Sequence, residues 1–86
     1  MDPWNILKYP HMTEKSIGLV ERENKLVFIV DRRSNKNKIK EAFEEAFNVK
    51  VKSINTFITR KGEKKAFIKL DPKHDAADIA VRLGII

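Results

Sequence analysis

Two groups of side chains in this 86-residue sequence have the types and spacing that a metal site or acid–base chemistry would need. In the first, His74 and Asp78 are four residues apart, so on a helix they would share one face and could supply two metal ligands. Because Asp75 follows His74 directly, the stretch is better explained as the start of a helix capped by that carboxylate. The other histidine, His11, is far away in the sequence, so we expect no metal site.

The second group is Glu63 and Lys65, which have the carboxylate–x–lysine spacing of some nucleases. In a chain with 35% charged residues this spacing arises readily by chance, and the pair lies beside the turn residue Gly62. The sequence contains no phosphate-binding glycine loop, no G-x-S-x-G motif and no cysteine. We therefore expect a protein that is not an enzyme and uses no cofactor or small-molecule substrate, with a small nuclease as the remote alternative.

The sequence concentrates basic side chains in its central part. Residues 32–70 hold twelve basic and four acidic residues, a net charge of +8, whereas the segments before and after them each carry −1. A merely solvated surface would intersperse both signs. A block of one sign between near-neutral flanks is typical of proteins that bind a polyanion, so we expect a nucleic acid as partner. A free-standing basic RNA- or DNA-binding domain would satisfy this prediction.

The basic block begins at an amphipathic helix whose charges are reversed. Apolar residues recur with helical spacing over residues 39–47, and the positive N-terminal end of such a helix favours acidic residues. Here basic residues crowd positions 32–40, and the acidic ones gather near the other end. One explanation is that the lysines are solvated, and that each costs a few tenths of a kcal/mol against the helix dipole. The other is that a phosphate binds the first-turn N–H groups together with the lysines and Asn35 or Asn37. The second basic cluster, over residues 50–69, favours a bound phosphate.

Hydrophobic periodicity predicts the elements that carry these side chains. We predict strands over residues 6–10, 25–30, 49–60 and 64–70, and helices over residues 13–22, 39–47 and 74–84. Thr13 is the expected N-cap of the first helix, Ser53 marks a bulge, and Gly62 reverses the chain. The order β-α-β-α-β-β-α predicts an α+β fold, with helices packed on a mostly antiparallel four-stranded sheet, in a single domain spanning residues 1–86.

The aromatic residues point less clearly to function. Three of them fall on core positions: Phe28, Phe43 and Phe47. Phe67 shares a strand face with Lys65 and Lys69 and could stack on a base, but a helix over that face would bury it, and we favour burial. Packing is also favoured over stacking for Trp4 and Tyr9. Around Phe67, "KKAFIKL" lacks the glycine and outer aromatics of the RRM motif.

Three stretches of the sequence together resemble one family: "YPHMTEKS" (9–16), "NKNKIKEAFEEAFNVKVKSINT" (35–56) and "GEKKAFIKL" (62–70). The chain resembles the universal large-subunit ribosomal protein L twenty-three family, in its archaeal form. The resemblance covers nearly the whole chain, with the motifs in order. The strand at 64–70 is similar to the family's signature, and Asn55-Thr56 matches a further motif.

This resemblance implies a cytoplasmic, structural ribosomal protein that binds large-subunit ribosomal RNA beside the nascent-chain tunnel exit, among neighbouring ribosomal proteins. Family members there help to form the docking platform for the signal recognition particle and other nascent-chain factors, and Glu14 occupies the place of the family's docking acid. The connection at 60–65 is too short to be the long bacterial hairpin that reaches into the tunnel, so the chain should not line the tunnel wall.

The predicted RNA-binding residues combine the basic clusters with the family motifs. They are Lys15, Arg32, Arg33, Asn35, Lys36, Lys38, Lys40, Asn55, Thr56, Arg60, Lys61, Lys64, Lys65 and Lys69. The N-terminal residues do not read as a signal peptide, and no apolar run approaches the length of a membrane span, so we expect no membrane insertion.

Overall fold

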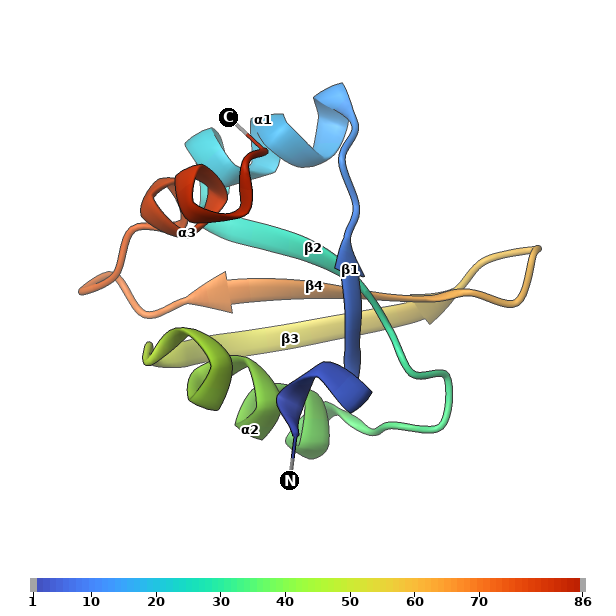
Figure 1. Ribbon diagram of the computed structural model, residues 1–86. Helices are drawn as coiled ribbons and strands as arrows, with labels where there is room; N and C mark the ends of the chain where they lie inside the picture. Colours follow the sequence, from blue (N-terminus) through green and yellow to red (C-terminus); the bar gives the residue numbers. More distant parts are fainter. Residues whose placement is uncertain (1, 86) are drawn as a thin grey trace.

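The structure is a computed structural model that describes residues 2–85 (Figure 1). Its elements are the 3₁₀ helix η1 (Pro3–Asn5), β1 (Leu7–Pro10), α1 (Glu14–Glu23), β2 (Lys25–Val30), α2 (Lys36–Phe47), β3 (Val51–Ile58), β4 (Lys64–Leu70) and α3 (Ala76–Leu83). This confirms the predicted α+β fold and its element order. The short η1 was not predicted, and α2 begins at Lys36 rather than at Ile39, because its first turn is polar and shows no apolar periodicity.

The four strands form one antiparallel sheet in the order β1-β2-β4-β3. β4 therefore lies between strands that are distant in sequence, and Phe67 on β4 pairs with both Val27 on β2 and Asn55 on β3. The register of β3 shifts between Val51 and Ser53, which confirms the predicted bulge. After this shift, residues 55 and 57 share a face with Phe67, because side chains alternate along a strand.

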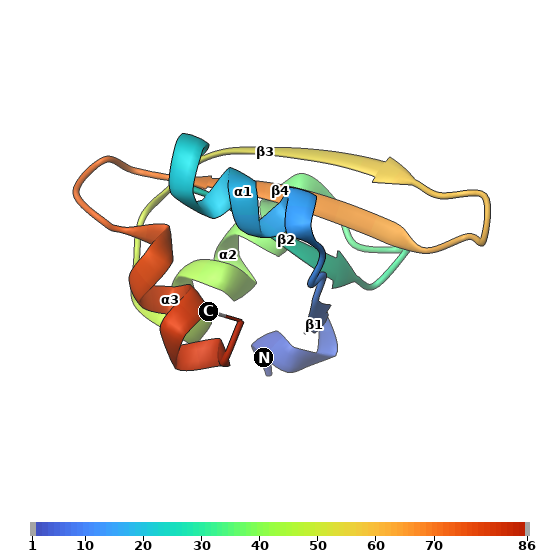
Figure 2. The same ribbon diagram turned by 90° about the horizontal axis from the view of Figure 1, so that it is seen from above.

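The two faces of the sheet have different surroundings. α2 and α3 lie on one face, which we call the core face, and β1 curls over the same side (Figures 1 and 2). Alternate residues of β4 point into the core: Ala66, Ile68 and Leu70 are all buried. Both faces of β2 are buried, as its continuous apolar run predicted.

The opposite face of β4 and β3, which we call the outer face, has no helix over it in the part of the chain that the structure describes (Figure 2). α1 packs beside β2 instead. Phe67 lies on this outer face, where it is only partly buried. The prediction that a helix buries Phe67 is therefore met only in part, because α2 and α3 lie on the other side of the sheet and only α1 approaches Phe67, from beside β2.

Helix ends are fixed by short polar side chains, as the sequence indicated for two of them. Thr13 and Ser16 form a reciprocal capping box at the start of α1, and Asp75 caps α3 by accepting a hydrogen bond from the backbone N–H of Ala77. α1 and α2 both end at an asparagine in the left-handed conformation, Asn24 (φ 56°) and Asn48 (φ 54°).

Asn24 also joins two helices that lie side by side. Its Oδ1 accepts a hydrogen bond from the N–H of Ala76 at 2.7 Å, and its Nδ2 donates one to the carbonyl of His74 at 2.9 Å. The end of α1 and the start of α3 are thereby tied together by one side chain.

Replacing Asn24 should therefore destabilise the fold more than replacing Asn48. We expect Asn24→Gly to lower the free energy of unfolding by about 1–3 kcal/mol, because glycine keeps the left-handed backbone but leaves the Ala76 N–H without its partner. Asn48→Gly is the matched control and should change stability by less than about 0.5 kcal/mol. Urea denaturation measures both, and equal losses in the two variants would contradict the tie between α1 and α3.

Candidate nucleic-acid interface

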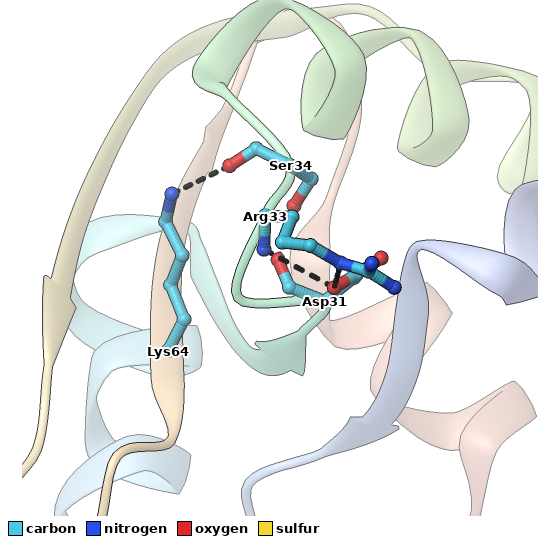
Figure 3. Close-up of polar contacts among 4 residues, drawn as sticks. All are labelled: Asp31, Arg33, Ser34 and Lys64. Carbon is cyan, nitrogen blue, oxygen red and sulfur yellow. Dashed lines mark hydrogen bonds and ion pairs between the residues drawn. The ribbon is translucent and has the colours of Figure 1, made fainter.

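The loop of residues 31–35 holds the basic start of α2 in place. The Asp31 carboxylate accepts a hydrogen bond from the backbone N–H of Arg33 at 3.1 Å, and the buried Ser34 hydroxyl donates one to the Asp31 carbonyl (Figure 3). Asn35 then caps α2, with its Oδ1 accepting from the N–H of Lys38 at 2.9 Å. These local bonds fix the backbone from which the first basic cluster projects.

Lys64 connects this loop to the hairpin between β3 and β4. Its ammonium group donates a hydrogen bond to the carbonyl of Ser34 at 2.5 Å (Figure 3). On the same side, the Arg32 guanidinium lies against Gly62, the left-handed residue (φ 85°) at which the hairpin reverses. Two basic clusters that are about 30 residues apart in sequence are thus brought together. We call this the basic surface, and it comprises Arg32, Arg33, Lys36, Arg60, Lys61 and Lys64.

Few of these positive charges are neutralised within the fold. Among residues 2–85 there are two ion pairs, Lys25 with Glu23 at 3.2 Å and Arg33 with Asp31 at 3.8 Å. Of the predicted RNA-binding residues, only Arg33 belongs to either pair, and its side chain is still largely exposed. A concentration of cations without internal counter-charges produces the positive potential that attracts a polyanion.

The remaining residues that we predicted for RNA binding lie on other parts of the molecule. Lys38 and Lys40 are exposed on α2, Lys15 is exposed on α1, and Lys65 and Lys69 lie on the outer face of β4. The side chains of Asn55 and Thr56 lie on opposite faces of the sheet. Asn55 faces outward opposite Phe67, whereas Thr56 points to the core face opposite Ala66.

The reversed charge at the other end of α2 has a local cause. The Glu44 carboxylate accepts a hydrogen bond from the N–H of Val51, the first residue of β3, at 2.9 Å. An acidic residue near the helix end thus has a structural role, because it fixes the start of the following strand. The basic residues at the start of α2 have no comparable local bond through their side chains among the described residues.

Phe57 is an exposed aromatic residue that the sequence analysis missed. The residue is 49% exposed, and its ring stacks nearly parallel on Phe67, with ring centroids 5.5 Å apart and 20° between the planes. The Lys65 ammonium lies 5.7 Å from the centroid of the Phe57 ring. Counting alternate positions beyond the Ser53 bulge would have placed Phe57 on the same face as Asn55 and revealed it.

The two aromatic residues of the N-terminal arm pack or form hydrogen bonds within the protein. The Trp4 ring meets Phe47 edge-on at 5.8 Å. The Tyr9 hydroxyl donates a hydrogen bond to the Glu63 carboxylate at 2.6 Å, and this bond raises the pKa of Tyr9. Glu63, the acid of the hypothetical nuclease pair, is therefore engaged with Tyr9.

Two other features of the described residues bear on the sequence predictions. Residues 2–85 contain no group of three acidic or histidine side chains placed to hold a metal ion, and no helix of a length and apolarity that would cross a membrane. Glu14 is the first residue of α1, and its side chain is exposed.

Comparison with known proteins identifies the family. The family model described as "Ribosomal protein L23" matches residues 5–79, which is most of the chain. The chain belongs to the ribosomal protein L23 family. Membership confirms the resemblance seen in the sequence and makes the chain a structural ribosomal protein, not an enzyme.

Curated members of the L23 family are similar over their full length. The chain is 49% identical to the "Large ribosomal subunit protein uL23" of Methanothermobacter thermautotrophicus, over 85 residues that span 99% of both chains. Its identity to the proteins of the same name from Methanococcus aeolicus and Methanococcus vannielii is 48% and 47%, with the same coverage. These archaeal relatives agree with the archaeal form predicted from the motifs.

His11 provides a spectroscopic test of how the outer face is arranged. Partial burial lowers the pKa of His11, the Lys65 ammonium lowers it further, and the Glu63 carboxylate opposes both effects. We expect an NMR titration to give a pKa below the ordinary value of about 6.5, and Lys65→Gln to move it back toward that value. Lys69→Gln, on the same strand face, is the control.

The same shift sets the sign of a small pH effect on stability. Between the lowered folded-state pKa and the unfolded value, the folded protein binds fewer protons than the unfolded chain. The contribution of His11 to the free energy of unfolding is therefore fully present above about pH 6.5 and is lost as the pH falls through this window. A His11 pKa above 6.5, or one that Lys65→Gln leaves unchanged, would contradict the placement of Lys65 beside His11.

Proposed function

We propose that this chain, a structural protein of the large ribosomal subunit, acts there by binding ribosomal RNA through its basic surface. In this proposal the basic surface binds large-subunit ribosomal RNA near the polypeptide exit tunnel, and other faces contact neighbouring ribosomal proteins. The single observation that carries it is the joining of two cationic clusters, almost without internal counter-charges, through Lys64 and Ser34. Family membership and the names of the archaeal relatives support it.

The basic surface would bind RNA by charge and shape, with no chemical reaction. Lysine and arginine side chains would contact phosphates and release counterions, which positions the protein on the folded RNA. At the start of α2, the side-chain Oδ1 of Asn35 accepts the capping hydrogen bond. The side-chain NH₂ group of Asn35 therefore remains to donate to a phosphate. The other backbone N–H groups of the first turn of α2 would add further donors.

The second part of the proposal concerns nascent-chain factors. An exposed acid at the first position of α1 is well placed for a protein contact, so Glu14 would contribute to docking the signal recognition particle or other factors at the tunnel exit. The connection between β3 and β4 spans only residues 59–63, which supports a location outside the tunnel wall.

The direct test of RNA binding is competition between a large-subunit ribosomal RNA fragment and unrelated structured RNA of equal length, at two salt concentrations. A preference of about 10³ or more at about 0.15 M salt would support the proposal. Equal affinities that both collapse with salt would leave only a generic basic domain and would overturn it.

Lys36→Gln should reduce the salt dependence of RNA binding. If Lys36 contacts one phosphate, the slope of log K against log salt should become shallower by about 0.7–0.9. Lys73→Gln removes the same charge at an exposed position before α3, at the other end of the sheet, and should leave the slope unchanged. Equal slopes for both variants and the wild type would remove Lys36 from the interface.

Glu14→Gln should weaken the docking of a nascent-chain factor without weakening RNA binding. We expect ribosomes carrying Glu14→Gln to bind purified signal recognition particle several-fold less tightly, because a charged contact is lost. Glu21→Gln, at another exposed position of α1, is the matched control. Co-sedimentation measures the binding, and unchanged affinity in the Glu14 variant would exclude this role for the signal recognition particle.

A further inference from the structure

A pocket lies where α1 meets the outer face of the sheet. It has a volume of about 190 Å³ and opens to the surface. The side chains on which the argument depends are His11, Lys15, Leu19, Phe57, Lys65 and Phe67. They come from three separate parts of the chain, and no acidic residue lines the pocket.

The floor of the pocket is aromatic and accessible. Phe57 and Phe67 form a near-parallel stack. Phe57 is half exposed because no helix of the described part of the chain covers it. Exposed aromatic rings on a sheet face are suited to stacking on unpaired bases, which is worth about 1–3 kcal/mol per base. The stack holds the Phe57 ring in place before any ligand arrives, which lowers the entropy cost of binding.

The rim of the pocket is cationic and polar. Lys15 from α1 and Lys65 from β4 both line it, and neither takes part in an ion pair among the described residues. His11 and Thr13 add groups that can form hydrogen bonds. An apolar peptide would leave these cations without partners, and an isolated phosphate would make no use of the rings. A nucleotide, with a flat base and an attached phosphate, matches both features.

We propose that this pocket binds one unpaired nucleobase of the RNA, stacked on Phe57, with the adjoining phosphate near Lys15 and Lys65. This inference rests on the proposed RNA-binding function and adds a base-binding site to it. The base contact is separate from the basic surface formed by the start of α2 and the hairpin, and it involves a residue outside the predicted RNA-binding set.

The first test compares two neighbouring positions of β3. Phe57 and Ile58 are 49% and 50% exposed, and they point to opposite faces of the sheet. Phe57→Leu should weaken binding to the ribosomal RNA fragment about 5- to 150-fold while leaving the salt slope unchanged, because stacking is lost and no charge is removed. Ile58→Leu should bind like the wild type. Equal affinities of the two variants would overturn the proposal.

The second test detects stacking directly, so it does not depend on a stability change in the first variant. Trp4 is the only tryptophan, so Trp4→Phe provides a background without tryptophan fluorescence. In that background, the emission of Phe57→Trp should be quenched by the RNA fragment but not by inorganic polyphosphate, which carries charge and no bases. Ile58→Trp should be quenched by neither. Quenching by polyphosphate, or equal responses at both positions, would overturn base stacking.

The two proposals fail in different ways. If the wild type shows no preference for large-subunit ribosomal RNA, the proposed function fails whatever the Phe57 variants do. If that preference holds but Phe57→Leu matches Ile58→Leu and the Phe57→Trp emission is not quenched, only the base pocket is wrong.

Discussion

Strand β4 imposes the constraint on which the rest of this structure depends. It lies between β2 and β3, and its strict alternation sends Ala66, Ile68 and Leu70 into the core while Lys65, Phe67 and Lys69 face outward. Any shift of one residue in this register would bury lysines and expose the core. The register also places Lys64 at the start of the strand, where its ammonium group reaches the loop before α2. Core packing and the assembly of the basic surface are therefore set by the same pairing.

Local sequence patterns were enough to predict the elements and their order. The apolar run of β2, the alternation of β4 and the capping residues Thr13 and Asp75 each act over a few residues, and all were found from the sequence. The start of α2 was placed three residues late, because polar residues dominate its first turn. Its N-cap, Asn35, was recognised only as a phosphate ligand.

Features that depend on non-local pairing could not be predicted in this way. The order β1-β2-β4-β3 joins strands that are distant in sequence, and no periodicity encodes it. Phe57 escaped notice because the bulge near Ser53 reverses which residues face outward. Phe67 was assigned to a helix-covered face because the sequence does not indicate on which side of the sheet each helix packs. The basic clusters were found separately, and only the fold shows that they meet.

The charge reversal in α2 has two parts, one at each end of the helix. Glu44, near the helix end, accepts a hydrogen bond from the backbone of Val51, which is a structural role. The lysines at the helix start have no such bond through their side chains among the described residues, and their cost against the helix dipole is a few tenths of a kcal/mol each. A bound phosphate would more than offset that cost, since hydrogen bonds to charged groups are worth about 1.5–3 kcal/mol. The arrangement is thus unfavourable for the isolated helix and favourable for an RNA-bound protein.

The measurement that tests the central claim most directly is lysine footprinting, in which the acetylation rates of all lysines are compared with and without the ribosomal RNA fragment. If the two basic clusters form one RNA-binding surface, Lys36 on α2 and Lys61 on the hairpin should be protected together, at the same RNA concentration. Lys73, at the other end of the sheet, should acetylate at its free rate. Protection of only one cluster, or equal protection of Lys73, would contradict the account.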